Sequence, residues 1–124
     1  MGLLTVWPCG SPMPNASNVN YLGRGAVEPN SVLVPVDSTG EVCVYSYAAA
    51  DVLVDVAGWF SSGFEPVVPN RIVDTRSGIG SPASRVVPSV PLRVRVAGAG
   101  GVPVSGASAV ALNVTAVDPD GWGF

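Results

Sequence analysis

The sequence predicts an all-β protein, an antiparallel β-sandwich of short valine-rich strands. Fifteen glycines and twelve prolines separate the valine-rich segments, a pattern typical of strands joined by turns. In the segment 91–98 (PLRVRVAG), apolar residues at 92, 94 and 96 alternate with arginines at 93 and 95. Such alternation indicates a strand with one buried and one solvated face. No window shows a helical period of apolar residues, so no helix is predicted.

The first half of the chain supplies five of the predicted strands. The segment 2–9 (GLLTVWPC) is the first, and residues 8–18 (PCGSPMPNASN) then have the composition of a loop. Valine-rich or aromatic runs predict further strands at 19–22, 31–36, 41–47 and 51–57. The sequence DSTG at 37–40 is a turn signal between two of them.

The second half begins after residues 58–70 (GWFSSGFEPVVPN), whose Gly, Ser and Pro content makes this joint the best internal boundary in the chain. Strands are predicted at 71–74, 92–96 and 109–117. In the last strand, the residues at 110, 112, 114 and 116 should face inward, and those at 113 and 115 outward. A length of 124 residues fits one domain spanning 1–124.

The two ends of the chain read as the two halves of one β-hairpin. Residues 109–124 form a strand that runs into a Pro-Asp-Gly turn, and residues 2–9 form a strand with nothing before it. We therefore expect the chain to be one period of an array whose units share strands, as in β-augmentation. The expected interface consists of Leu3, Leu4, Val6, Val110, Leu112 and Val114.

Cys9 and Cys43 could be an inert buried pair, a redox pair or a disulfide. Each lies on a predicted strand, and their separation differs from that of a C-x-x-C redox site. We favour a disulfide, which implies an oxidising compartment. A faint internal repeat, in which both cysteines fall near equivalent strand ends, suggests two similar halves packed face to face with the bridge between them.

Several segments together resemble a repeat of secreted actinobacterial proteins. They are PNRIVDTRSGIG (69–80), LRVRVAGAGGVP (92–103), SAVALNVTAVDP (108–119), LLTVWPCGSPMPNASNVNY (3–21) and DVLVDVAGWF (51–60). The order is rotated, because residues 1–60 resemble the back half of one repeat and residues 64–124 the front half of the next. The resemblance covers nearly the whole chain and implies an appended or tandem extracellular module.

The absence of histidine and the placement of the acids limit the kinds of catalytic or metal site that the chain can form. Without a histidine, a Ser/Cys–His–acid arrangement and histidine-based zinc sites are impossible. Asp55 could pair with Asp51 or Asp74 as catalytic carboxylates, but acids among valines are more simply explained as partners of arginines or backbone groups. Asp74 and Arg76 are predicted to form a structural ion pair. We expect no catalytic residue, no metal and no cofactor.

Turn acids at 37, 118 and 120 offer a calcium site as a further alternative, although such acids usually cap turns. The glycines at 98–101 lack the G-x-G-x-x-G spacing of a phosphate-binding loop and are expected to form a turn.

Large aromatic residues gather near strand ends and at the joint. They could form a sugar-stacking surface, or they could pack in the core and between units. The candidates are Trp7, Tyr45, Tyr47, Trp59 and Trp122.

The sequence thus predicts a secreted or cell-surface structural and adhesive module whose partners are copies of itself or neighbouring repeats. The alternative is a carbohydrate-binding module with a glycan as partner. A nucleic-acid partner is not expected, because the net charge is −3 and the six arginines are scattered. Membrane insertion is not expected either, since the long uncharged stretch 96–117 is broken by glycine, proline and serine.

Overall fold

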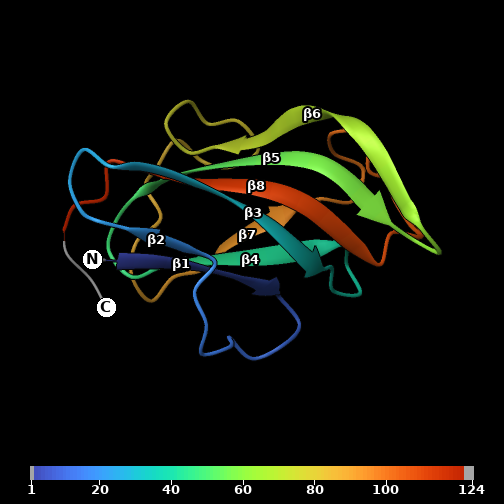
Figure 1. The fold of residues 1–124 in the computed structure, drawn as a ribbon, viewed down its shortest axis with the longest axis horizontal. Coiled ribbons are helices and arrows are strands. Elements are labelled where there is room, and N and C mark those ends of the chain that lie inside the picture. The colour runs from blue at the N-terminus through green and yellow to red at the C-terminus, as the bar shows by residue number, and fades with distance from the viewer. Residues whose placement is uncertain (1, 122–124) are drawn as a thin grey trace.

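The computed structural model describes residues 2–121, which form two antiparallel four-stranded sheets with no helix (Figure 1). The strands are β1 (Gly2–Pro8), β2 (Val19–Tyr21), β3 (Val27–Pro35), β4 (Glu41–Ser46), β5 (Asp51–Phe60), β6 (Phe64–Asp74), β7 (Leu92–Arg95) and β8 (Ala109–Val117). Sheet A has the order β2-β1-β4-β7, and sheet B has the order β3-β8-β5-β6. The predicted all-β sandwich is confirmed.

The core lies between the sheets and consists mainly of valines. Alternation places every second residue of a strand on the inner face, and the inner faces of both sheets contribute to a single buried cluster. In β8 the predicted inward residues Val110, Leu112, Val114 and Ala116 are all buried. In β7, Val94 is buried and both arginines are exposed, as the alternation predicts.

The predicted hairpin between the two ends of the chain is wrong. β8 lies in sheet B with β3 on one side and β5 on the other, whereas β1 lies in sheet A between β2 and β4. The candidate interface residues Leu3, Leu4, Val6, Val110, Leu112 and Val114 therefore belong to two strands that already have ladder partners on both sides. β8 has no free edge, and on the open side of β1 beyond Leu4 the Val6 N–H is bonded to the Asn18 side chain.

The two segments lie near each other without pairing. The start of β1 and the end of β8 are at the same end of the sandwich (Figure 1). There, the Leu3 carbonyl accepts a hydrogen bond from the Tyr47 N–H, and the Ala49 carbonyl accepts one from the Asp120 N–H. The short segment after β4 is thus bonded both to the start of β1 and to the residues that follow β8.

The edge strands of both sheets are poorly suited to strand addition. In β3 the Ser31 N–H donates a hydrogen bond to the side-chain oxygen of Asn30, on the side away from β8. Pro29 and Pro35 lie an even number of residues from Ser31, so their nitrogens face the same edge of β3. Proline has no N–H to donate there. β2 has only three residues, β7 presents Arg93 and Arg95, and β6 carries two prolines. Short, charged or proline-containing edges disfavour pairing between molecules.

The joint at residues 58–70 is part of a hairpin rather than a boundary. β5 and β6 pair around it from Phe60 and Phe64 onward, with register shifts that let β6 bulge between Pro66 and Asn70. The ring of Phe64 lies over Gly58, where a Cβ atom would come within 2.3 Å of the ring. Glycine at position 58 therefore makes room for the Phe64 ring and does not mark a flexible linker. Both sheets contain strands from 1–60 and from 64–124.

The disulfide between Cys9 and Cys43 is confirmed. However, it does not join the two sheets, as the internal repeat had suggested. Cys9 directly follows β1, and Cys43 lies on β4 opposite Trp7, so the bridge links neighbouring strands of sheet A. It fixes the point at which the chain leaves the sheet after β1.

We expect that replacing both cysteines (Cys9→Ala with Cys43→Ala) will lower the free energy of unfolding by about 3–4 kcal/mol, because the bridge closes a long loop in the unfolded chain. The sequence separation is 34 residues. Chemical denaturation measures this difference, and the native protein under reducing conditions is the control. A loss below about 1 kcal/mol would show that the bridge contributes little.

Candidate functional site

The outer face of sheet A carries two tyrosines, Tyr45 on β4 and Tyr47 directly after it. Val44 and Ser46 of β4 point into the core, so Tyr45 and Tyr47 point outward. Tyr47 is 40% exposed, and Tyr45 is half-buried. Thr5 of β1 lies opposite Tyr45 in the ladder. These residues form the floor of a groove.

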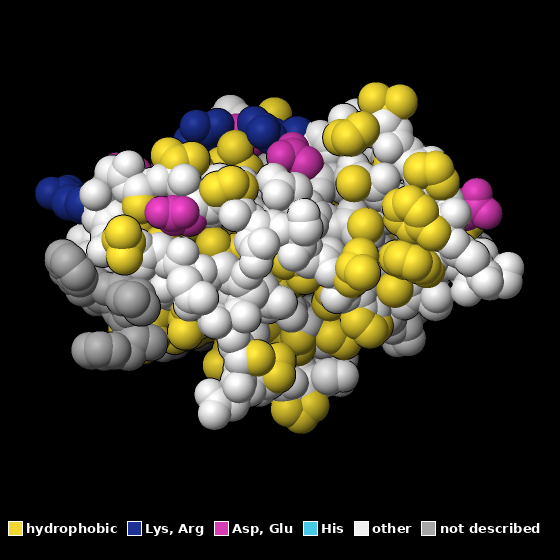
Figure 2. All heavy atoms as spheres, viewed as in Figure 1, with side chains coloured by type: hydrophobic (Ala, Val, Ile, Leu, Met, Phe, Trp, Pro, Cys, Tyr) yellow, Lys and Arg dark blue, Asp and Glu magenta, His cyan; other side chains and the backbone are white. Residues whose placement is uncertain are grey.

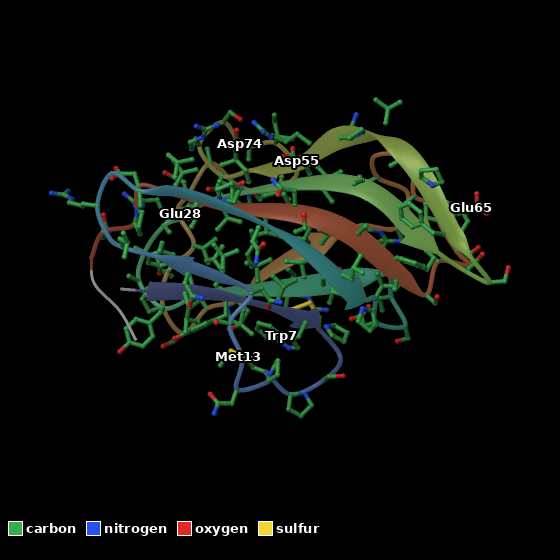
Figure 3. All side chains as sticks on the ribbon, in the orientation of Figure 1. Trp7, Met13, Glu28, Asp55, Glu65 and Asp74 are labelled. Atoms are coloured by element: carbon green, nitrogen blue, oxygen red, sulfur yellow. A yellow bond between two sulfur atoms is a disulfide. The ribbon has the colours of Figure 1, made fainter. Side chains whose placement is uncertain are left out.

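Residues 9–18 form the wall of this groove. The Thr5 hydroxyl donates a hydrogen bond to the Ala16 carbonyl at 2.6 Å, and Trp7 Nε1 donates to the Ser11 carbonyl at 3.0 Å. Both donors project from the outer face of β1, so the segment arches over that face instead of continuing the sheet. Figure 3 shows Trp7 under β1 and Met13 in the loop beyond it.

Asn18 lets the chain leave the sheet while the backbone groups of β1 keep their hydrogen-bond partners. Its side-chain oxygen accepts a hydrogen bond from the Val6 N–H at 2.7 Å, while its own N–H donates to the Leu4 carbonyl. The side chain thus replaces the next rung of the β1–β2 ladder. Since a buried N–H without a partner is costly, this substitution is what makes the loop compatible with a folded sheet.

The resulting tyrosine groove has a volume of about 500 Å³, within the range of small-molecule sites. It is lined by Leu3, Thr5, Met13, Pro14, Asn15, Ala16, Ser17, Tyr45 and Tyr47. None of these nine residues is charged. Asn15 and Ser17 are exposed and offer an amide and a hydroxyl group beside the two tyrosines.

Of the aromatic candidates, the structure brings only Tyr45 and Tyr47 together in this groove. Trp7 is 6% exposed and lies beneath the loop, where it supports the wall. Trp59 is partly buried and packs against the core. Trp122 lies outside the described residues. The aromatic residues therefore have mixed roles, and neither sequence interpretation holds for all of them.

A second hollow of about 450 Å³ lies at one end of the sandwich, between the 37–40 turn and residues 102–107. Its lining contains no aromatic residue. It therefore lacks the stacking surface that distinguishes the tyrosine groove.

The outer face of sheet B carries a row of alternating charges. Arg71 Nε donates to Asp55 Oδ1 at 2.9 Å, and Arg71 Nη1 lies 3.6 Å from Asp74 Oδ2. Arg76 donates through Nε and Nη2 to the two oxygens of Asp74, at 3.0 and 2.8 Å. Figure 2 shows a group of blue and magenta side chains at the top of the view, and Figure 3 labels Asp55 and Asp74 in that region.

This geometry decides the role of the carboxylates considered for catalysis. Arg71 lies between Asp55 and Asp74, so each carboxylate has an arginine partner. The hydrogen bonds from Arg76 lower the pKa of Asp74 to about 2, although its side chain is only 7% exposed. Asp51 accepts a hydrogen bond from the Thr75 hydroxyl. A carboxyl with such a low pKa does not serve as a general acid near neutral pH.

The acids of the turns also have internal partners. Asp37 Oδ1 accepts hydrogen bonds from the backbone N–H groups of Glu41 and Thr39 and from the Thr39 hydroxyl, which lowers the pKa of Asp37. Asp118 accepts a bond from the Gly25 N–H, and Asp120 pairs with Arg85. These carboxylates act as turn caps and ion-pair partners.

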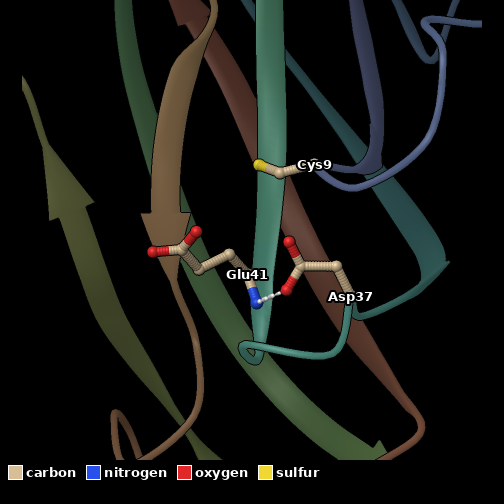
Figure 4. A group of neighbouring side chains, drawn as sticks. All are labelled: Cys9, Asp37 and Glu41. Carbon is tan, nitrogen blue, oxygen red and sulfur yellow. Dashed lines mark hydrogen bonds between the residues drawn. The ribbon is translucent and has the colours of Figure 1, made fainter.

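Cys9, Asp37 and Glu41 come within 4.8 Å of one another through their potential ligand atoms (Figure 4). The sulfur of Cys9 is in the disulfide, so it cannot act as a thiolate ligand. Arg93 also bonds to Glu41 and lies 3.9 Å from Asp37. We do not assign a metal site to this cluster.

The groove wall was not predicted from the sequence. Residues 8–18 were predicted only as a loop, because Gly, Pro, Ser and Asn show where a chain turns but not which face it covers. The one available signal was the VYSY segment at 44–47, where alternation puts the two tyrosines on one face.

Comparisons with protein-family models, with curated proteins and with solved structures find no match for this chain. Among the described residues, no helix is long and apolar enough to cross a membrane.

We expect Asp74→Asn to lower the free energy of unfolding at neutral pH by about 1–3 kcal/mol, because the arginines lose an ionised acceptor. In the native protein, the lowered pKa of Asp74 means that its contribution is complete above about pH 4 and is lost as the pH falls toward about 2. The variant should therefore lose less stability over that range.

Denaturant unfolding at a series of acidic pH values measures the slope. Asp120→Asn is the matched control, since the side chain of Asp120 is 50% exposed in its pair with Arg85. If Asp74→Asn and the native protein lose stability equally below pH 4, the ion pair does not govern acid stability.

Proposed function

We propose that this protein is a non-catalytic extracellular module that binds carbohydrate through the tyrosine groove. The observation that carries the proposal is the pair of outward tyrosines at the end of β4, beside an uncharged wall that includes Asn15 and Ser17. Sugar rings present apolar C–H faces and a rim of hydroxyls. Aromatic faces with nearby amide and hydroxyl groups suit both parts of such a ligand.

The way in which the loop is held supports a binding role. Hydrogen bonds from Thr5, Trp7 and Val6, together with the disulfide, fix residues 9–18 before any ligand arrives. A site that is already ordered loses less conformational entropy on binding. A disulfide also fits an oxidising, extracellular compartment.

The charges support a role without catalysis. Glycoside hydrolysis normally requires two carboxyl groups flanking the bond to be cleaved. The tyrosine groove contains no acid, and the acids of sheet B lie on the opposite outer face in ion pairs with Arg71 and Arg76.

We expect Tyr45→Ala and Tyr47→Ala each to weaken glycan binding by about tenfold or more, equivalent to about 1.4 kcal/mol, while Tyr→Phe at either position retains most of the affinity. A glycan array followed by isothermal titration calorimetry measures the effect. Phe64→Ala removes an exposed ring from the other sheet and is the control. Binding that is unchanged in both alanine variants, or lost equally in Phe64→Ala, would contradict the assignment.

A structural and adhesive role is the second candidate, and it is favoured by an apolar strip on sheet B. At one end of the outer face, the register aligns Leu33 with Ala111 and Gly58, and Pro35 with Ala109 and Phe60. Leu33 is 72% exposed and Phe64 is 49% exposed. Figure 2 shows a group of yellow side chains toward the right-hand end of the view.

The partner proposed for this strip is a second copy of the chain. Each copy carries a net charge of −3, so two copies repel one another less where both surfaces are uncharged. Because the strand edges are poorly suited to pairing, such an assembly would use faces and not shared strands.

If this second role is correct, sedimentation analysis should detect concentration-dependent association that Leu33→Glu abolishes. Leu22→Glu is the matched control, because Leu22 is also an exposed leucine but lies outside the strip. A native protein that stays monomeric at the highest soluble concentration would rule out association through the strip.

A further inference from the structure

The charges around the tyrosine groove restrict its ligand further, provided that the groove binds carbohydrate as proposed. The nine lining residues carry no charge, and residues 9–18 (CGSPMPNASN) contain no charged side chain. A carboxylate, sulfate or ammonium group on a bound sugar would therefore lose part of its hydration without gaining a counter-charge. Burial of an unpaired charge is strongly unfavourable.

The charged residues Arg93 and Glu41 on the same face do not change this conclusion. Arg93 lies opposite Cys43 in the ladder. Cys43 is two residues before Tyr45 on β4, so the two face the same side. The guanidinium of Arg93 bonds to Glu41, and Asp37 lies near it. An anionic sugar would have to compete with these carboxylates for Arg93. The whole chain, with a net charge of −3, also repels anionic polysaccharides at long range.

The direction of the groove restricts the shape of the ligand. Tyr45 and Tyr47 are separated by one residue, so they project about 7 Å apart along the strand. The wall stands over β1, the neighbouring strand, since Ala16 is bonded to Thr5. β7 pairs with β4 only from Glu41 to Val44, so it does not extend beside the tyrosines. The groove thus runs parallel to β4.

From this arrangement we infer that the tyrosine groove takes an uncharged linear oligosaccharide of at least two sugar rings, lying along β4. Successive rings stack on Tyr45 and Tyr47. The hydroxyl groups at the edge of the sugar chain face Asn15 and Ser17 of the wall. A single sugar ring reaches only one of the tyrosines, so it gains only part of this contact.

The test uses the intact protein and two ligand series. The first contains neutral β-linked oligosaccharides of glucose, N-acetylglucosamine and xylose, from one to six rings. The second contains acidic oligosaccharides of galacturonate and hyaluronate of matched length. Calorimetric titration measures Kd for each ligand in low and high salt, with the native protein, the Tyr45→Ala/Tyr47→Ala double variant and Phe64→Ala.

The expected result has three parts. At least one neutral series binds, and its Kd falls about tenfold or more between one ring and four rings. That Kd changes less than about twofold between roughly 20 mM and 500 mM salt, because no ion pair forms. The affinity is lost in the double tyrosine variant and retained in Phe64→Ala.

Other outcomes overturn one or both proposals in distinguishable ways. Tyrosine-dependent binding of the acidic series that weakens in high salt would overturn the uncharged ligand and leave carbohydrate binding intact. A monosaccharide that binds as tightly as its oligomers would overturn the two-ring arrangement alone. If no member of either series binds, or if binding ignores both tyrosines, the groove is not a carbohydrate site and both proposals fail.

Discussion

The hydrogen-bond requirement of β1 determines the shape of the candidate site. This strand is paired with β4 along most of its length, but on its other side the ladder with β2 covers only Gly2, Leu3 and Leu4. The next N–H group, on Val6, would be left without a partner. Asn18 supplies that partner through its side chain, and the following proline at position 8 has no N–H to satisfy. The edge of β1 is thereby completed without another strand.

This local solution releases residues 9–17 from the plane of the sheet. Thr5 and Trp7, both on the outer face of β1, then hold the released segment above that face. Asn18 also accepts a hydrogen bond at its carbonyl from the Asn30 side chain of β3, so the same residue connects the edges of the two sheets. A short asparagine-containing segment thus links closure of the sandwich to formation of the groove wall.

The two outer faces of the sandwich differ in their chemistry. On sheet B, a row of ion pairs along β5 and β6 gives way to an apolar strip around Leu33 and Phe64. On sheet A, the tyrosine groove is uncharged and bordered by a fixed loop. Because carbohydrate recognition combines ring stacking with uncharged hydrogen-bonding groups, sheet A supports the first proposal. Sheet B supports the second, and the two roles use separate surfaces.

The sequence by itself determined the features that depend on neighbours along the chain. Alternation of apolar and polar residues predicted most of the strands and, in β7 and β8, which side chains face the core. The spacing of Asp74 and Arg76 placed them within reach of one another on one local segment, and their ion pair needs no distant partner. The two cysteines indicated a disulfide by their number and positions.

Only the tertiary structure decided which strands are neighbours. Valine-rich strands are nearly interchangeable as ladder partners, so local pattern cannot distinguish a hairpin of 109–117 with 2–9 from two strands in different sheets. The long-range register settled this by placing β8 between β3 and β5. It also decided that residues 9–18 cover the outer face of β1 and that Trp7 is buried while Tyr47 is exposed. These outcomes depend on how each backbone group finds a hydrogen-bond partner in three dimensions, which composition and spacing do not encode.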